Sequence, residues 1–175
     1  PELQYAIMNS FIIAIYTTII GLFLGTLFVV YCHEKYSDLL LNIFYSILGI
    51  PEIVIAVALL NFFSSLRIHL GFATLISGHV LLSLAYIIPI LHARYQEIVK
   101  RLLEAAYDLG ATRTHAFLTI ILPLLLPSIL ASGLLVFIIS LDDFLIAFFC
   151  AGPSVQTLPL YIFSTIRAGT TPIIN

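Results

Sequence analysis

The most informative deficit in this sequence is charge. Of its 175 residues only 9% are charged, whereas 61% are hydrophobic, and the mean hydropathy is +1.14. Ordinary soluble domains carry about 25% charged and roughly 45–50% apolar residues. A soluble fold of this length has too little interior to bury so much apolar surface, and the hydrophobicity also excludes a disordered chain. The composition therefore indicates a protein whose solvent is the lipid bilayer.

Cysteines and basic residues are also scarce. Two cysteines exclude a disulfide scaffold, and seven Lys and Arg residues with a net charge of −2 give no electrostatic footprint for nucleic acid. No Cys/His spacing suggests a metal site, and no Walker-type glycine loop is present. We therefore expect a chain that holds no metal and hydrolyses no nucleotide itself.

The few charges leave long uncharged stretches between them. A spanning helix needs about 20 apolar residues. Four such spans are predicted at about 7–32, 39–64, 71–93 and 125–149. The first is too long for a signal peptide, and no basic residue precedes it. We expect one all-α transmembrane domain over 1–175 and, because the sequence begins at Pro1, a fragment that lacks flanking spans.

Basic residues predict how the spans are oriented. With the first span entering from outside, five basic residues fall on the inner side and two on the outer side, which agrees with the positive-inside rule. The inner residues are Lys35, Arg94, Lys100, Arg101 and Arg113, and the outer ones are Arg67 and Arg167. Cys32 and Cys150 are then on opposite faces, so they are not expected to pair.

The one long polar stretch is the inner loop between the third and fourth spans, about 94–123. Apolar residues recur at helical spacing from Glu97 to Leu109, and Glu97 and Arg101 form an i,i+4 pair. Gly110 is expected to end this helix, and Thr112 or Thr114 to cap a second short helix that runs towards Pro123. Two interpretations are open: a surface helix that links two spans, or a docking element.

The spacing inside this loop resembles a known motif. Glu104-Ala105-Ala106, three residues, Gly110, nine residues, Ile120, one residue and Leu122-Pro123 match the EAA loop of bacterial ABC importer permeases at every position. In that family the loop forms a coupling helix that sits in a cleft of the ATP-binding subunit. The resemblance implies that Glu104, Ala105, Ala106 and Gly110 form the ATPase-docking site.

Further segments extend the resemblance over essentially the whole chain. They are similar to the second permease subunit of spermidine/putrescine importers; these segments are Ile50–Val54, Ser140–Phe144, Ala151–Pro153, Thr157–Leu160 and Thr171–Asn175. The resemblance implies a type I permease core of about six spans, of which this chain would hold about four and lack the first and the last. This chain departs from the family pattern at Ile173, where the family usually has an acidic residue.

The resemblance also implies the setting of the chain. It would be a multi-pass, non-enzymatic subunit of the bacterial inner membrane that translocates polyamines. ATP and magnesium would be bound by a partner ATPase dimer rather than by this chain. A second, homologous permease and a periplasmic or surface substrate-binding protein would complete the importer.

Acidic residues within the spans are the candidates for the substrate pathway. A carboxylate in the membrane costs roughly 2.5–3.5 kcal/mol on insertion scales, so it usually faces a cavity or a partner. Asp142 and Asp143 diverge by about 100° on a helix, so one is expected to face the pore while the other caps or pairs. The alternative is that the pair stabilises a kinked helix end. Glu52, just after Pro51, either lines the pore or stabilises a helix N-terminus.

The physical case for a polyamine is that it is an elongated polycation with methylene spacers. Its passage needs carboxylates at different depths with apolar or aromatic walls, and Glu52 with Asp142 and Asp143 would fit. Phe144, Phe148 and Tyr161 are candidates for cation–π contact, although most aromatic rings here are expected to pack or face lipid. His79 and His92 suggest either a proton relay or hydrogen-bonded packing residues.

Other functions remain open at this point. An ABC permease for ferric iron, sulfate or thiamine would have the same docking loop. A less favoured class is an ion-coupled secondary transporter in which Glu52, Asp142 and Asp143 relay protons. The third is a membrane scaffold that transports nothing.

The energy source separates the first two classes. For an ATP-driven importer, we expect deletion of the ATPase to abolish uptake of radiolabelled solute in whole cells. Uptake that persists after this deletion but collapses with an uncoupler would instead support ion coupling.

Overall fold

The computed structural model describes residues 1–98, 102 and 104–169, and this part of the chain consists of helices joined by turns and loops. The helices are α1 (Glu2–Gly49), α2 (Glu52–Ser65), α3 (Phe72–Ile98), α4 (Glu104–Asp108), α5 (Arg113–Ala116), a π-helical turn (Phe117–Ile121), α6 (Leu122–Asp142), α7 (Leu145–Cys150) and α8 (Leu158–Arg167). This confirms the predicted all-α class. The predictions for Lys100, Arg101 and the segment 171–175 lie outside the described residues, as do those for the side chains of Cys32, Lys35, Glu104 and Arg113.

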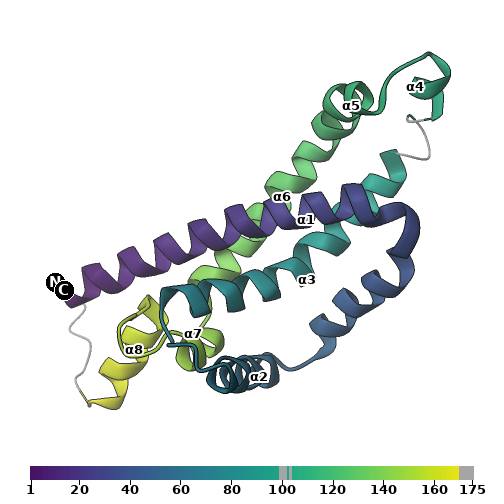
Figure 1. The fold of residues 1–175 in the computed structure, drawn as a ribbon. Helices are drawn as coiled ribbons and strands as arrows, with labels where there is room; N and C mark the ends of the chain where they lie inside the picture. The colour runs from purple at the N-terminus through teal and green to yellow at the C-terminus, as the bar shows by residue number, and fades with distance from the viewer. Residues whose placement is uncertain (99–101, 103, 170–175) are drawn as a thin grey trace.

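Three long helices carry the fold, and the short ones gather at their two ends. Figure 1 shows α1, α3 and α6 running lengthwise, with α2, α7 and α8 at one end and α4 and α5 at the other. Within the described residues, three helical stretches are long and apolar enough to cross a membrane: Glu2–Tyr31, Phe72–Ile98 and Thr114–Asp142. A fourth is obtained only if the bent pair Leu41–Gly49 and Glu52–Ser65 counts as one span.

The predicted span 39–64 is not one straight helix, which corrects the sequence-based boundaries. Its two halves meet at 109°, with extended backbone at Ile50 (φ −85°, ψ 133°) and at Pro51 (ψ 130°). Proline lacks an N–H and disfavours helical backbone at the residue before it. The chain therefore turns here, and α2 starts again at Glu52.

The helix that covers most of the predicted span 125–149 has other bounds at both ends. The helical stretch begins earlier, at Thr114, because the expected second short helix continues through the π-helical turn Phe117–Ile121 into α6. The wider turn lies directly before Pro123, whose ring would clash with the carbonyl four residues earlier in a regular α-helix. At the other end α6 stops at Asp142, and Asp143 is extended with ψ 121°.

Close contact between α1 and α3 depends on two glycines four residues apart. A Cβ added at Gly21 would lie 2.7 Å from Ser83 Oγ, and one added at Gly25 would lie 2.5 Å from Ile87 Cγ2. In lipid, helices associate through such close packing rather than through the hydrophobic effect. Ile87 is itself fully buried, so the small residues of α1 set the distance between the two longest helices.

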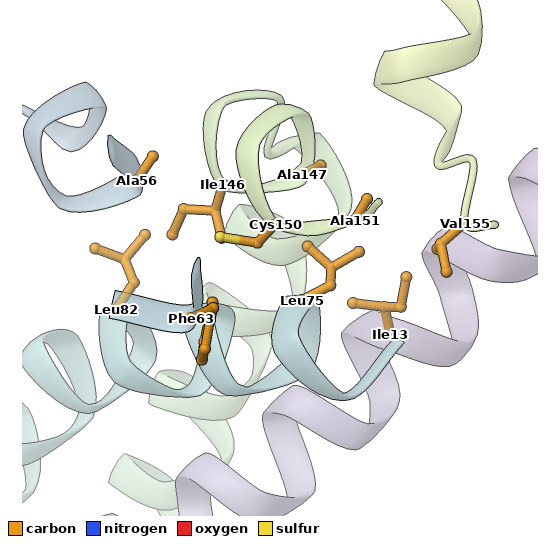
Figure 2. Close-up of a cluster of buried hydrophobic side chains, with 10 residues drawn as sticks. All are labelled: Ile13, Ala56, Phe63, Leu75, Leu82, Ile146, Ala147, Cys150, Ala151 and Val155. Carbon is orange, nitrogen blue, oxygen red and sulfur yellow. The ribbon is translucent and has the colours of Figure 1, made fainter. Parts of the chain in front are cut away.

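The short helices at the α2 end share a buried apolar cluster with α1 and α3. Figure 2 shows its ten residues: Ile13, Ala56, Phe63, Leu75, Leu82, Ile146, Ala147, Cys150, Ala151 and Val155. Gly78 of α3 allows the approach of α7, because an added Cβ there would lie 2.8 Å from Ile146 Cγ2. The cluster thereby fixes α7 between α2 and α3.

The turn after α7 gives a test of this packing. Gly152 has φ +67°, and an added Cβ would lie 2.5 Å from the backbone oxygen of Leu70. Gly169 has a similar φ of +72°, but among the described residues no atom lies within 4 Å of an added Cβ.

We therefore expect Gly152→Ala to destabilise the protein more than Gly169→Ala does. Both variants carry the left-handed backbone cost of roughly 1–2 kcal/mol, and only Gly152→Ala adds a clash of about 1–3 kcal/mol. Thermal unfolding of the detergent-purified protein measures the difference. Equal melting temperatures for the two variants would contradict the close approach to Leu70.

Candidate functional site

The break between α6 and α7 places Asp143 at the centre of a buried polar group. Its Oδ1 accepts a hydrogen bond from the backbone N–H of Ile146 at 3.0 Å, in the first turn of α7. A carboxylate at a helix start satisfies an N–H that has no partner within the helix. Asp143 is only 7% exposed, so its second oxygen also needs a partner.

His79 of α3 supplies that partner. Its Nε2 lies 3.0 Å from Asp143 Oδ2, an ion-pair distance, although the angles do not meet those of a hydrogen bond. Its other ring nitrogen, Nδ1, forms a 2.7 Å hydrogen bond with Ser140 Oγ on α6. The ring is 4% exposed. His79 is thus a hydrogen-bonded interior residue, as one sequence interpretation had it, but it also contacts a carboxylate that the sequence had not linked to it.

Glu52 brings a second carboxyl group to the same place. It begins α2, which packs against α7, and its carboxyl interacts electrostatically with both Asp143 and His79. The side chain is half-buried. The expectation that Glu52 and Asp143 lie at different depths is therefore wrong, because the 109° bend before α2 turns Glu52 towards α7.

Asp142 separates from its neighbour as the helical geometry predicts. It is exposed on the surface of this chain, whereas Asp143 is buried. Asp142 ends an otherwise apolar helix, and an acid there is costly against lipid. Its side chain is therefore suited to a polar passage or to a partner subunit.

A small cavity adjoins the buried pair. Its volume is about 10 Å³, and it is lined by Thr17, His79, Leu82, Ser83, Val136, Ile139, Ser140 and Asp143. This is about the space of one water molecule, so the cavity is too small for a polyamine. A larger cavity of about 710 Å³ lies between α1, α3 and the start of α6, and its described lining contains no carboxylate.

Aromatic rings gather next to the break. Phe144 lies 4.9 Å from Phe163 and 5.5 Å from Phe148 between ring centroids. Phe163, on α8, belongs to this aromatic cluster, and nothing in the sequence pattern predicted that it would. Tyr161 is also on α8 and half-buried, and its carbonyl accepts a hydrogen bond from Ser164 Oγ at 2.8 Å.

The predicted docking loop lies at the opposite end of the long helices (Figure 1). Gly110 has φ +83°, its N–H donates to the Tyr107 carbonyl at 2.9 Å, and the Ala111 N–H donates to the Ala106 carbonyl at 3.0 Å. These two bonds form a Schellman motif, which confirms that Gly110 ends the first short helix. Beside the glycine, Leu109 is 89% exposed.

The start of the second helix in this loop is confirmed as well. Thr112 Oγ1 accepts a hydrogen bond from the His115 N–H at 3.3 Å, so Thr112 rather than Thr114 is the cap. Within the EAA motif, Ala106 is buried and Ala105 is exposed. Glu97 pairs with Arg94 at 2.6 Å, whereas its predicted partner Arg101 lies outside the described residues.

Comparison with known proteins places these features in a family. Residues 7–173 match the family described as "Binding-protein-dependent transport system inner membrane component". The chain is 44% identical over 125 residues to the "Spermidine/putrescine transport system permease protein PotC" of Haemophilus influenzae, which covers 71% of this chain and 49% of the relative. With the Escherichia coli protein of the same name it shares 32% over 177 residues, 99% of this chain and 67% of the relative.

A relative that is named for putrescine alone is also similar to this chain. The "Putrescine transport system permease protein PotI" of E. coli is 37% identical over 134 residues, covering 73% of this chain and 48% of the relative. The chain thus spans between about half and two thirds of the length of these relatives. The family match over residues 7–173 nevertheless includes the polar loop 94–123, the acids within the spans and the apolar helices. The chain therefore belongs to the binding-protein-dependent transport system inner membrane components, the ABC importer permeases that the EAA spacing indicated.

Proposed function

We propose that this chain is the second permease subunit of an ABC importer that translocates spermidine and putrescine across the bacterial inner membrane. The observation that carries the proposal is the division of the chain into two polar ends. Carboxylates from α2 and α6 lie at one end, and a capped helix–glycine–helix element lies at the other. The names of the relatives indicate the class of cargo.

The chemistry of the acidic end suits a polyamine. Ammonium groups need carboxylates, and methylene spacers need apolar or aromatic walls. Asp142 is exposed, Glu52 is half-buried and Asp143 is close to Glu52, so the three present negative charge beside the Phe144, Phe148 and Phe163 rings. Aromatic faces attract ammonium groups by about 0.5–2 kcal/mol. Tyr161, on the same helix as Phe163, is the remaining aromatic candidate for the pathway.

The buried and exposed acids would contribute differently. One oxygen of Asp143 accepts a hydrogen bond from the α7 backbone, and the other faces His79. We therefore assign Asp143 mainly a role in holding these helices in place. Asp142 and Glu52 are more accessible and would meet the cargo. The 10 Å³ cavity is not the passage, which would run along the surface of this chain against the second, homologous permease.

The loop at the other end would dock the ATPase. Glu104, Ala105, Ala106 and Gly110 correspond to the EAA motif, and Leu109 offers an almost fully exposed apolar side chain beside them. Exposed leucine on a short helix is suited to a cleft in a partner protein. ATP and magnesium would be bound by the ATPase dimer and not by this chain.

ATP-driven closure of that dimer would then move the loop as a rigid body. The loop joins α3 to the long helix that ends at Asp142, so displacement at one end is transmitted along packed helices to the acids at the other. Such motion alternates access to the two sides of the membrane. A binding protein would deliver the cargo at the acidic end.

Leu109→Ala tests the docking site. Because the side chain is exposed, the substitution leaves the fold intact, but the loss of an apolar anchor of about 1–2 kcal/mol weakens ATPase binding roughly 5- to 30-fold. Binding of the purified ATPase to the permease complex in nanodiscs measures this. Leu66→Ala is the matched control, because the Leu66 side chain is 55% exposed and lies at the other end of the long helices, after α2. Equal ATPase affinity for the two variants would contradict docking at this loop.

Asp142→Asn tests the cargo. Removing a charge-assisted contact worth roughly 1.5–3 kcal/mol raises the KM for spermidine about 10- to 100-fold. The readout is radiolabelled uptake into proteoliposomes, with Glu2→Gln, an exposed acid at the start of α1, as the control. Unlabelled putrescine should compete, whereas ferric iron and sulfate should not. An unchanged KM together with competition by iron or sulfate would reject the polyamine assignment.

A further inference from the structure

We propose that His79 is a positioning residue, which holds Asp143 in place and thereby keeps Glu52 available to the cargo. The inference rests on the proposed function for its transport readout. Its structural basis is independent of the cargo, because it comes from the contacts that join α3, α6, α7 and α2.

Both ring nitrogens of His79 are engaged by polar groups. Nε2 faces Asp143 Oδ2 at 3.0 Å, and Nδ1 bonds Ser140 Oγ at 2.7 Å. The hydroxyl fixes the plane of the ring, and the ring then fixes the position of the carboxyl group. The exposed fractions of the His79 and Asp143 side chains are only 3% and 2%, so bulk solvent does not reach either contact.

The other oxygen of Asp143 links this pair to the course of the backbone. By accepting the Ile146 N–H, it holds the start of α7 at the point where α6 has ended. α7 in turn packs against α2, whose first residue is Glu52. Any movement of the Asp143 carboxyl is therefore passed to the helix that carries the second acid.

The contact between His79 and Asp143 also affects the charge balance between Asp143 and Glu52. Two carboxylates this close repel each other unless a cation or a donor intervenes. His79 interacts with both of these carboxyl groups, those of Asp143 and Glu52. His79 therefore competes with Glu52 as the partner of the Asp143 carboxyl group, which keeps Glu52 available to an ammonium group of the cargo.

The test compares four variants in proteoliposomes, with uptake expressed per folded complex. His79→Leu removes the partner of a buried carboxylate and should lower Vmax about tenfold or more. His79→Gln keeps an N–H donor near the position of Nε2 and should recover Vmax to within about threefold of the unmodified protein. In His79→Leu/Asp143→Asn the stranded charge is gone, so Vmax should exceed that of His79→Leu at least about threefold. Glu52→Gln, by contrast, should raise the KM.

Other roles give different results. If Asp143 itself bound the cargo, the double variant would transport no better than His79→Leu. If His79 only stabilised the fold, His79→Leu would reduce the amount of folded complex but not its Vmax. Either result would overturn the proposal.

A second measurement separates this inference from the proposed function. Thermal unfolding of the His79→Leu, Asp143→Asn and double-variant complexes, without cargo, should show non-additive shifts in melting temperature. Non-additive shifts in a complex that does not take up polyamines would reject the proposed cargo alone. Additive shifts in a complex that does take them up would reject the role of His79.

Discussion

The buried carboxyl group of Asp143 is the constraint on which the acidic end of this protein depends. A charge in a low-dielectric interior is tolerated only where hydrogen bonds or an ionic partner compensate its desolvation. Here the Ile146 N–H and the His79 ring provide that compensation from two different helices. Meeting this requirement ends α6, begins α7, and ties both to α3. The Asp143 carboxyl group therefore contributes to the arrangement of these three helices.

Small residues provide the second organising feature. Gly21 and Gly25 let α1 approach α3, and Gly78 lets α7 approach the same helix from another side. Since lipid offers no hydrophobic drive between helices, such contacts and the buried polar group share the task of association. The buried polar group determines the register of the helices, because Ser140, His79 and Asp143 must meet at hydrogen-bonding distances. Apolar packing alone would permit one helix to slide along another.

The two ends of the chain carry different chemistry for a physical reason. Under the proposed function, the carboxylates that attract a cation lie where the cargo arrives, and the docking element extends from the bilayer on the side of its partner. Leu109 protrudes because Gly110 takes a left-handed conformation that turns the chain back sharply. The continuous helix from Thr114 to Asp142 connects the two ends, which gives coupling between them a direct mechanical path.

The sequence by itself determined the membrane class, the polar loop, the cap at Gly110 and the divergence of Asp142 from Asp143, because each follows from local composition or helical geometry. It did not determine the bend that divides 39–64, although Pro51 marked it, since the angle depends on what α2 packs against. Nor did it give the meeting of His79, Asp143 and Glu52, which come from segments far apart in the chain. Only the tertiary structure decided which acid is buried, because burial depends on the helices that close around it.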